Sequence, residues 1–443
     1  CIGVCGSLPN DEPGYMNYGT AALDRGYAVS VTDTGHWGAN AADGRWAYKN
    51  ILAREDYAYR AVTEVARVSK AIINRHYGKT IEHAYFEGCG NGGRQGLIEA
   101  QRYPADFDGV IAAAPVIDLS GFITQWIWNI QSDTDSQGQP IFNPAKVNFL
   151  SNAVKQACAN EDGLIDDPRQ CHFNPATLQC GPEITSPADS LSCFSRAEVK
   201  MLDKWYSGPK LSDGRKLPIE GIPLGSEASW HSAVGKHTIW RILMEDSVRY
   251  LIFDFKTEYD VLQLNLENDL PKIKSMASML ESTDPDLSAF KARGGKLILY
   301  SGWADPVVTP LTPVAYYNDV EQAMGGRKVT QDFTRLFMVP GMSNCGFPDK
   351  NSSGIDEYDI DPLTALEQWV EQGIAPNTLL TTKFDQNEQF EWQRPVCPYP
   401  KQAVYLGSGD RTKAEAWSCK ITPSIANSEG QSQSPVQVKG EHD

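Results

Sequence analysis

The stretch GCGNG, residues 88–92, decides the fold. It follows an apolar run at residues 81–88 with the composition of a strand and precedes a helix-like run at residues 93–101. Glycine permits a strained turn and the close approach of a helix to the strand before it. The stretch therefore predicts a strand–turn–helix unit with Gly90 at the centre of the turn.

The same alternation of strand and helix patterns continues on both sides of this turn. Further strands are expected at residues 27–32, 108–114, 296–301 and 335–339, and further helices at residues 56–76, 314–324 and 362–372. Alternation of this kind predicts an α/β fold, in which helices cover both faces of a mostly parallel sheet.

One long segment, residues 117–288, lacks the alternation and is rich in tryptophan. An insertion into an α/β core normally lies over the carboxyl ends of the strands, where such folds bind ligands. We therefore expect a core formed by residues 1–116 and 289–423, a lid at residues 117–288 and a flexible tail at residues 424–443. The lid tryptophans, which could line a ligand pocket or form the core of the lid itself, are Trp126, Trp128, Trp205, Trp230 and Trp240.

Three positions at predicted strand ends have the spacing of a catalytic triad. Residues 88–92 match the G-x-S-x-G nucleophile elbow of α/β-hydrolases, except that Gly90 stands where that motif has serine. Asp305 follows the strand at 296–301, and Asn344 follows the strand at 335–339. The chain order of nucleophile, acid and base is the order of that fold. We predict an α/β-hydrolase-like sheet with these positions at one edge.

The chain resembles the tannase and feruloyl esterase family, which also contains bacterial hydrolases of mono-esterified terephthalate. The resemblance covers nearly the whole chain. It is carried by residues 32–36 (TDTGH), 85–96 (YFEGCGNGGRQG), 224–227 (LGSE) with Trp230, 296–306, 338–346 and 394–400 (RPVCPYP). It implies phenolic or aromatic acyl esters as ligands.

The resemblance also implies disulfide pairs. In the family the nucleophilic serine follows one cysteine, the histidine precedes another, and these cysteines bond each other, which implies a Cys89–Cys345 bridge. The other implied pairs are Cys158–Cys171, Cys180–Cys193 and Cys397–Cys419. Cys1 and Cys5 remain without an assigned partner, and we expect the sequence to begin inside a longer precursor.

Two departures from the family pattern bear on the chemistry. The resemblance puts serine at the position of Gly90 and histidine at the position of Asn344, while Asp305 matches the family's acid. Glycine has no hydroxyl group, and an asparagine amide is not basic at neutral pH. Loss of either residue costs a serine hydrolase about 10⁶ in turnover. Hydrolysis through an acyl-enzyme is therefore not supported by these residues.

A third departure lies in the lid. The family's calcium loop corresponds to residues 158–168 here, which are shorter and lack two carboxylate positions. Calcium takes six to eight oxygen ligands. The remaining candidates are Asp162, Asp166, Asn160 and the Leu164 carbonyl, so calcium is an open but disfavoured alternative, and no other cofactor is expected. Natural divergence explains the three departures better than inactivation by design, which needs only one change.

Several other groups could still contribute to a site. The backbone amides of Asn91 and Gly3 could stabilise an anion, and His36 could act as a substitute base or make only structural hydrogen bonds. Asp305 could have a raised pKa and act as an acid or base, or it could only bind Asn344 or a backbone amide.

These residues favour an aromatic or polyketide-like ligand and a non-hydrolytic reaction of the cyclase, cycloaddition, lyase or isomerase type. One alternative is a carboxylic ester hydrolase, either inactivated or with a substitute base. The other is a secreted small-molecule-binding protein without turnover.

The amino-acid composition argues against several other classes of protein. The chain has 443 residues, 41% apolar residues and a net charge of −16, which argues against a membrane or nucleic-acid partner. Ten cysteines without paired CxxC steps indicate disulfides and a secretory compartment. The sequon at Asn351 is compatible with a glycoprotein. The oligomeric state stays open.

Overall fold

The computed structural model describes residues 22–39, 42–184, 190–230, 239–253, 260–344, 360–384 and 389–422, with Ile239, Trp240 and Phe384 described only in their backbone. Its centre is a parallel sheet in the order β1-β2-β3-β4. The strands are β1 (Tyr85–Cys89), β2 (Gly109–Ala113), β3 (Lys296–Gly302) and β4 (Thr334–Val339). The predicted α/β class is confirmed.

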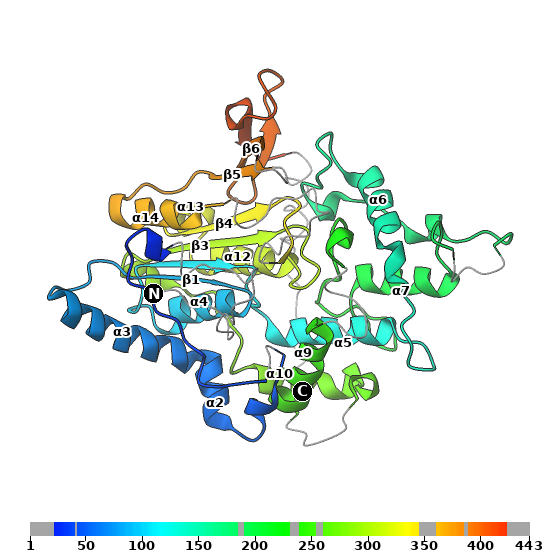
Figure 1. The fold of residues 1–443 in the computed structure, drawn as a ribbon, viewed down its shortest axis with the longest axis horizontal. Coiled ribbons are helices and arrows are strands. Elements are labelled where there is room, and N and C mark those ends of the chain that lie inside the picture. The colour runs from blue at the N-terminus through cyan, green and yellow to red at the C-terminus, as the bar shows by residue number, and fades with distance from the viewer. Residues whose placement is uncertain are drawn as a thin grey trace, which may run out of the picture.

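Helices cover both faces of this sheet (Figure 1). One face packs on α3 (Ala61–Tyr77), α4 (Asn91–Arg102), α11 (Ser288–Ala292) and α12 (Leu311–Ala323). The other face packs on α14 (Pro362–Gln372), which ends at Gly373 as predicted. Alternate strand residues belong to different core clusters, Phe86 to one and Tyr85 to the other, because a parallel sheet is buried on both sides.

The remaining core elements lie before and after the sheet. Before it come η1 (Arg45–Ala47), α2 (Ile51–Glu55) and the π-helical turn η2 (Asp56–Arg60). After β3 come α13 (Arg327–Thr330) and two antiparallel pairs, β5 (Leu379–Phe384) with β6 (Phe390–Val396) and β7 (Gln402–Tyr405) with β8 (Trp417–Lys420), with η11 (Ala414–Ala416) before β8. Figure 1 shows the β5–β6 hairpin projecting from the sheet region.

Residues 27–32 do not form the expected strand, because no backbone ladder joins them to another described segment. Tyr27 and Val29 nevertheless pack against the core on the α14 face. Within the described residues, their apolar pattern corresponds to this side-chain packing.

The segment between β2 and β3, residues 114–295, is called the insert below. Its described elements are helical: α5 (Leu119–Ser132), α6 (Val147–Cys158), α7 (Arg196–Ser207), α9 (Ile239–Asp246), α10 (Leu266–Ala277), α11 just before β3, and the short turns η3 (Pro144–Lys146), η4 (Pro168–Gln170), η5 (Pro175–Leu178), η6 (Glu227–Ser229), η7 (Ser247–Ile252) and η8 (Val261–Gln263). In Figure 1, α6 and α7 lie beyond one end of the sheet. None of the described helices is long and apolar enough to cross a membrane.

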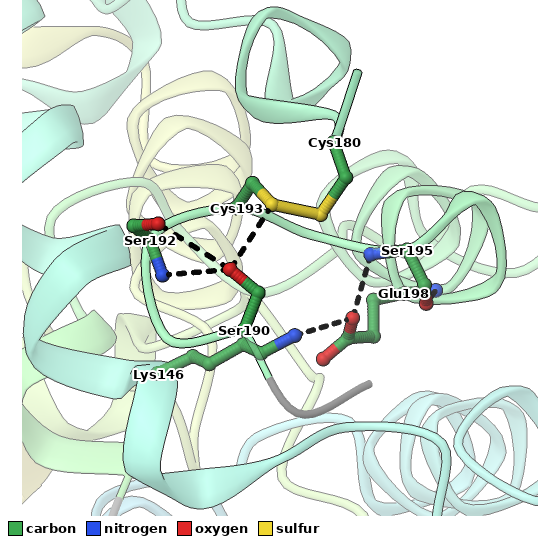
Figure 2. The surroundings of a disulfide bond; sticks show 7 residues. All are labelled: Lys146, Cys180, Ser190, Ser192, Cys193, Ser195 and Glu198. Atoms are coloured by element: carbon green, nitrogen blue, oxygen red, sulfur yellow. Dashed lines mark hydrogen bonds and ion pairs between the residues drawn. A yellow bond between two sulfur atoms is a disulfide. The ribbon is translucent and has the colours of Figure 1, made fainter. Parts of the chain in front are cut away.

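The insert has its own core and its own cross-links. Disulfides Cys158–Cys171 and Cys180–Cys193 are present as predicted, as is Cys397–Cys419 in the C-terminal region. Near Cys180–Cys193, the Glu198 carboxylate accepts from Lys146 at 2.8 Å and from the Ser195 backbone N–H at 2.7 Å (Figure 2). This buried ion pair joins η3, just before α6, to the first turn of α7.

Arg94 of α4 connects the core to its neighbours. Its fully buried guanidinium donates to the Ala58 and Leu280 carbonyls at 2.7 and 3.1 Å, and to the Tyr57 carbonyl at 2.8 Å. One side chain next to the elbow therefore donates hydrogen bonds to three backbone carbonyls, two in η2 and one in the insert.

We expect Arg94→Met to lower the free energy of unfolding by about 3 kcal/mol, because it leaves these buried carbonyls without donors. Arg102→Met is the matched control, since the exposed Arg102 lies on the same helix and donates to the Glu281 carbonyl. Denaturant unfolding measures both. Equal losses in the two variants would contradict the role assigned to Arg94.

Candidate active site at the carboxyl edge of the sheet

The turn between β1 and α4 has the conformation of a nucleophile elbow. Gly90 has φ 60° and ψ −113°, its N–H donates to the Ala113 carbonyl at 3.0 Å, and its carbonyl accepts from the Val116 N–H at 3.2 Å. A positive φ strains residues that carry a side chain, and nucleophile elbows are strained in this way. The predicted turn is confirmed, with a glycine at its apex.

The helix after the elbow begins at Asn91. The first N–H groups of a helix have no intrahelical acceptor, and the helix dipole makes this end partly positive. The Asn91 amide is therefore placed to stabilise negative charge near Gly90. The second predicted amide, that of Gly3, lies outside the described residues.

Asp305 and Asn344 are brought together, as the chain order predicted. Asn344 donates its side-chain N–H to Asp305 Oδ2 at 2.9 Å. The other carboxylate oxygen, Oδ1, accepts from the backbone N–H groups of Val307 and Val308 at 2.8 and 2.9 Å. Asp305 has no exposed surface, and Asn344 is 4% exposed. The structural role weighed for Asp305, binding Asn344 and backbone amides, is thus observed.

The loops after β3 and β4 are in direct backbone contact. The Ala304 N–H donates to the Met342 carbonyl at 3.0 Å, and the Trp303 N–H donates to the Val339 carbonyl at 2.9 Å. A Cβ atom on Gly302 would lie 2.1 Å from the Met342 carbonyl oxygen. Glycine at 302 therefore permits the approach that places Asp305 beside Asn344.

Burial raises the pKa of Asp305 to about 7, although the hydrogen bonds from Asn344 and from the Val308 and Val307 amides favour its charged form. The raised pKa agrees with the sequence-based expectation. Asp305, Asn344, Val307 and Val308 are all buried, so this carboxyl group does not face solvent.

Cys89, which precedes the elbow glycine, is disulfide-bonded. Its expected partner Cys345 lies outside the described residues, as do Cys1, Cys5 and the sequon at Asn351. The Cys89–Cys345 bridge therefore stays a prediction.

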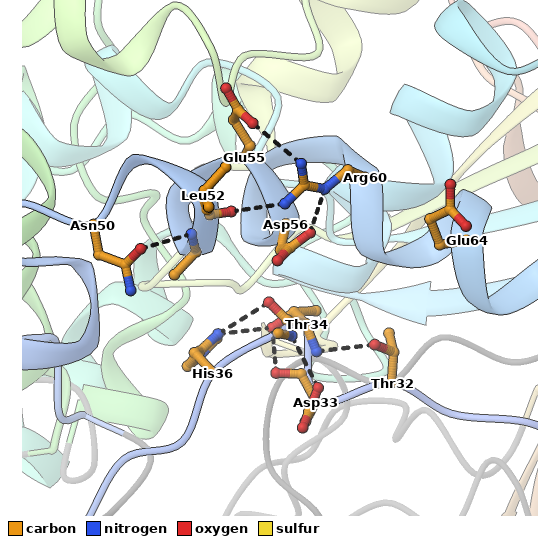
Figure 3. Close-up of polar contacts among 12 residues, drawn as sticks. Thr32, Asp33, Thr34, His36, Asn50, Leu52, Glu55, Asp56, Arg60 and Glu64 are labelled. Atoms are coloured by element: carbon orange, nitrogen blue, oxygen red, sulfur yellow. Dashed lines mark hydrogen bonds and ion pairs between the residues drawn. The ribbon is translucent and has the colours of Figure 1, made fainter.

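His36 belongs to an aromatic cluster. Its ring stacks on Trp46 at 3.8 Å and meets Tyr57 edge-on at 5.6 Å. Its Nδ1 lies within hydrogen-bonding distance of the Thr34 hydroxyl and carbonyl (Figure 3). Burial lowers its pKa. Within the described part of the chain, no hydrogen bond or ring contact joins His36 to Asp305 or Asn344, which favours its structural role.

A hollow with a cavity volume of about 20 Å³ lies where the insert meets the carboxyl ends of β3 and β4. From the core it is lined by Trp303, Ala304 and Gly341. From the insert it is lined by Lys155, Gly163, Leu164, Ile165, Leu224, Gly225, Ala228 and Ser229. This volume holds about one water molecule, so a ligand would enter only if the walls moved apart, and neither Gly90 nor the Asp305–Asn344 pair lines the hollow. Trp303 lies in a segment that carried the family resemblance, whereas no pattern in the sequence distinguished Lys155.

The tryptophans of the insert are mostly core residues. Trp205 and Trp230 are buried against each other and against Phe142, and Trp126 belongs to a second apolar cluster. They form the interior of the insert and do not line the hollow. The side chain of Trp240 lies outside the described residues.

The calcium candidates do not fit calcium. The Leu164 carbonyl accepts from the Asn160 N–H at 2.8 Å, and the Asn160 side-chain amide donates to Asp166 Oδ2 at 2.9 Å. Each oxygen of Asp162 lies 3.1 Å from an arginine guanidinium nitrogen. Among the described residues, no three carboxylate, histidine or cysteine groups converge on a metal position. This donor set is occupied by protein groups and opposed by adjacent positive charge.

These features define a protein of the α/β-hydrolase type with an insert at its strand ends. Comparison with known proteins gives the family. The profile described as tannase and feruloyl esterase matches residues 1–420. The chain belongs to the tannase and feruloyl esterase family.

Individual relatives agree with this assignment. An uncharacterized esterase from Xanthomonas campestris is 31% identical over 91% of this chain and 76% of its own. A probable feruloyl esterase B-1 from Aspergillus terreus is 32% identical over 89% of this chain and 76% of its own. The crystal structure of feruloyl esterase B from Aspergillus oryzae matches with a TM-score of 0.81 at 28% identity, covering 95% of this chain and 84% of that one.

Asp305→Asn tests the pKa of the buried acid. The folded-state pKa of about 7 is above the ordinary 3.8, so the folded protein holds this proton more tightly than the unfolded chain does. The resulting stabilisation of the folded state is complete at low pH and is lost as the pH rises from about 4 through 7. Across that window the wild type should lose up to about 1.4 kcal/mol per pH unit relative to the variant. Denaturant unfolding at several pH values measures the difference. Parallel stability curves would show that Asp305 has an ordinary pKa.

Proposed function

We propose that this protein binds an aromatic or polyketide-like small molecule at the carboxyl edge of its sheet and does not hydrolyse esters through an acyl-enzyme. Turnover of that ligand would be a non-hydrolytic reaction of the cyclase, cycloaddition, lyase or isomerase type. The observation that carries the proposal is the elbow apex, where Gly90 offers no nucleophilic oxygen.

The acid and base positions support the same conclusion. Acyl-enzyme hydrolysis needs a base that takes the nucleophile's proton and later returns it to the leaving group. Asn344 instead donates a hydrogen bond to Asp305 through a neutral amide. An amide cannot carry a proton back and forth at neutral pH.

Other features of the site suit binding and charge stabilisation. The first N–H groups of α4 can interact with a developing negative charge next to Gly90. Trp303, Leu164, Ile165 and Leu224 border the hollow, so a flat ring would meet apolar walls there once the insert moved away from the core. We propose that the insert acts as the lid of this site.

Ester hydrolysis is the second candidate, favoured by the similarity to relatives that include probable feruloyl esterases. It would require water as the nucleophile and a base other than residue 344. The third candidate is a binding protein without turnover, which would bind the ligand and leave it chemically unchanged.

We also propose that the protein is secreted. The three described disulfides support this, because such bonds persist mainly in oxidising compartments.

Incubation of the protein with methyl ferulate, methyl gallate and mono(2-hydroxyethyl) terephthalate tests the proposal. We expect no ester hydrolysis above background, measured by chromatography of the free acids, and saturable binding of at least one ester, measured by calorimetry. Turnover at the roughly 1–10³ s⁻¹ of ordinary enzymes would overturn the non-hydrolytic proposal. Failure of all three to bind would overturn the ligand class.

The double variant Gly90→Ser with Asn344→His tests whether the remaining geometry is that of an esterase. Because Asp305 already accepts a hydrogen bond from residue 344, we expect it to orient the new imidazole and raise ester hydrolysis by about 10³. Gly90→Ala with Asn344→His is the matched control, since it has a similar elbow strain and no hydroxyl. Equal rates in the two double variants would contradict the prediction.

A further inference from the structure

The loop after α6, residues 159–167, forms a wall of two hollows. Gly163, Leu164 and Ile165 line the candidate ligand hollow. Asp166 and Asp167 line a second hollow, with a cavity volume of about 30 Å³, beside β6. Trp303 borders both. The position of this loop therefore determines the shape of the candidate site on its insert side.

Asp162 connects this loop to the C-terminal strands through two ion pairs. Asp162 Oδ1 lies 3.1 Å from an Arg394 nitrogen, and Oδ2 lies 3.1 Å from an Arg411 nitrogen. The Asp162 and Arg394 side chains are only 15% and 10% exposed, so solvent ions screen this pair weakly. Arg411 also pairs with the exposed Glu161 at 3.2 Å.

The two guanidinium groups are themselves fixed by aromatic rings. Arg394 lies 4.5 Å from the centroid of the Trp417 ring, and Arg411 lies 5.3 Å from the same centroid. Arg411 also lies 4.4 Å from the Tyr405 centroid, and the Trp417 indole N–H donates to the Arg411 carbonyl at 2.9 Å. Cation–π contacts of this kind hold the guanidinium groups in the orientation in which they pair with Asp162.

Both partner segments are cross-linked near the contact. Cys158–Cys171 closes the segment that contains the loop, and Cys397–Cys419 joins the end of β6 to β8. The Asp162–Arg411 pair thus connects two disulfide-closed segments that are far apart in the sequence, and Arg394 lies in β6, just before the second of them. A displacement of either one would move the other.

We propose that Asp162, Arg394 and Arg411 form a clamp that positions residues 159–167, and with them a wall of the candidate ligand site, without a metal ion. Arg394 and Arg411 are positioning residues, because they act through the loop. The statement about ligand binding rests on the proposed function, whereas the statement about the loop does not. The guanidinium groups supply the positive charge that the acidic loop requires.

Hydrogen–deuterium exchange of Asp162→Asn and Arg411→Gln tests the clamp. We expect residues 159–167 to exchange at least about tenfold faster than in the wild type, because the loop opens more often. The melting temperature should fall by about 4 °C in Asp162→Asn, which leaves Arg394 without its partner, and by less in Arg411→Gln. Arg411→Lys keeps the charge and should restore part of the protection.

Arg215→Gln is the matched control. Arg215 pairs with Asp213 in the same insert at 3.6 Å, with both side chains mostly exposed. We expect unchanged exchange at residues 159–167. If Asp162→Asn and Arg411→Gln exchange there like the wild type and this control, the clamp is wrong.

Adding calcium distinguishes the proposed arginine clamp from a calcium site in the same loop. Wild-type protein in millimolar calcium chloride and in EGTA should have the same melting temperature and the same exchange at residues 159–167. A higher melting temperature and slower exchange with calcium would overturn the proposal, since the loop would then bind the metal.

The affinity for methyl ferulate tests whether the clamp affects the candidate ligand site. We expect Arg411→Gln to bind it about fivefold more weakly than the wild type, and Arg411→Lys and Arg215→Gln to bind it nearly as well. Equal affinity in Arg411→Gln, together with faster loop exchange, would overturn the positioning role. Absence of binding by the wild type would count against the proposed function, and the exchange experiment would still decide the clamp.

Discussion

The burial of a parallel sheet on both faces is the constraint on which the rest of this structure depends. Strands β1 to β4 alternate their side chains between two apolar clusters, one closed by α3, α4, α11 and α12 and the other by α14. Parallel neighbours need crossover connections, so every strand ends at the same edge. That edge collects the elbow at Gly90, the carboxylate of Asp305 and the amide of Asn344.

The Asp305–Asn344 contact joins the loops after β3 and β4 at the candidate site. Asp305 is buried and has three hydrogen-bond donors, two from backbone amides and one from Asn344. Removing Asn344 would leave part of a buried carboxyl group unsatisfied, which is costly whatever the site does. The contact therefore contributes to stability whether or not the site transfers a proton.

Much of the fold could be predicted because local pattern and tertiary role agree. The helix ending at Gly373 and the strand–turn–helix unit at Gly90 follow from periodicity and glycine placement. Residues 27–32 show the limit of this method. Their apolar pattern fits a strand, but pairing depends on a neighbour with matching backbone groups, and the described structure provides only side-chain packing.

The sequence by itself determined the class of fold, the three strand-end positions and the absence of a hydroxyl group at residue 90, because these are set by residue identity and short-range spacing. The three disulfide pairs were implied by the family resemblance and are present in the structure. Only the tertiary structure decided what surrounds those positions. It placed Trp205 in the core of the insert and Trp303 in the hollow, and it brought Arg394 and Arg411 to Asp162 across more than two hundred residues. Such contacts depend on how distant segments pack, and no local pattern encodes them.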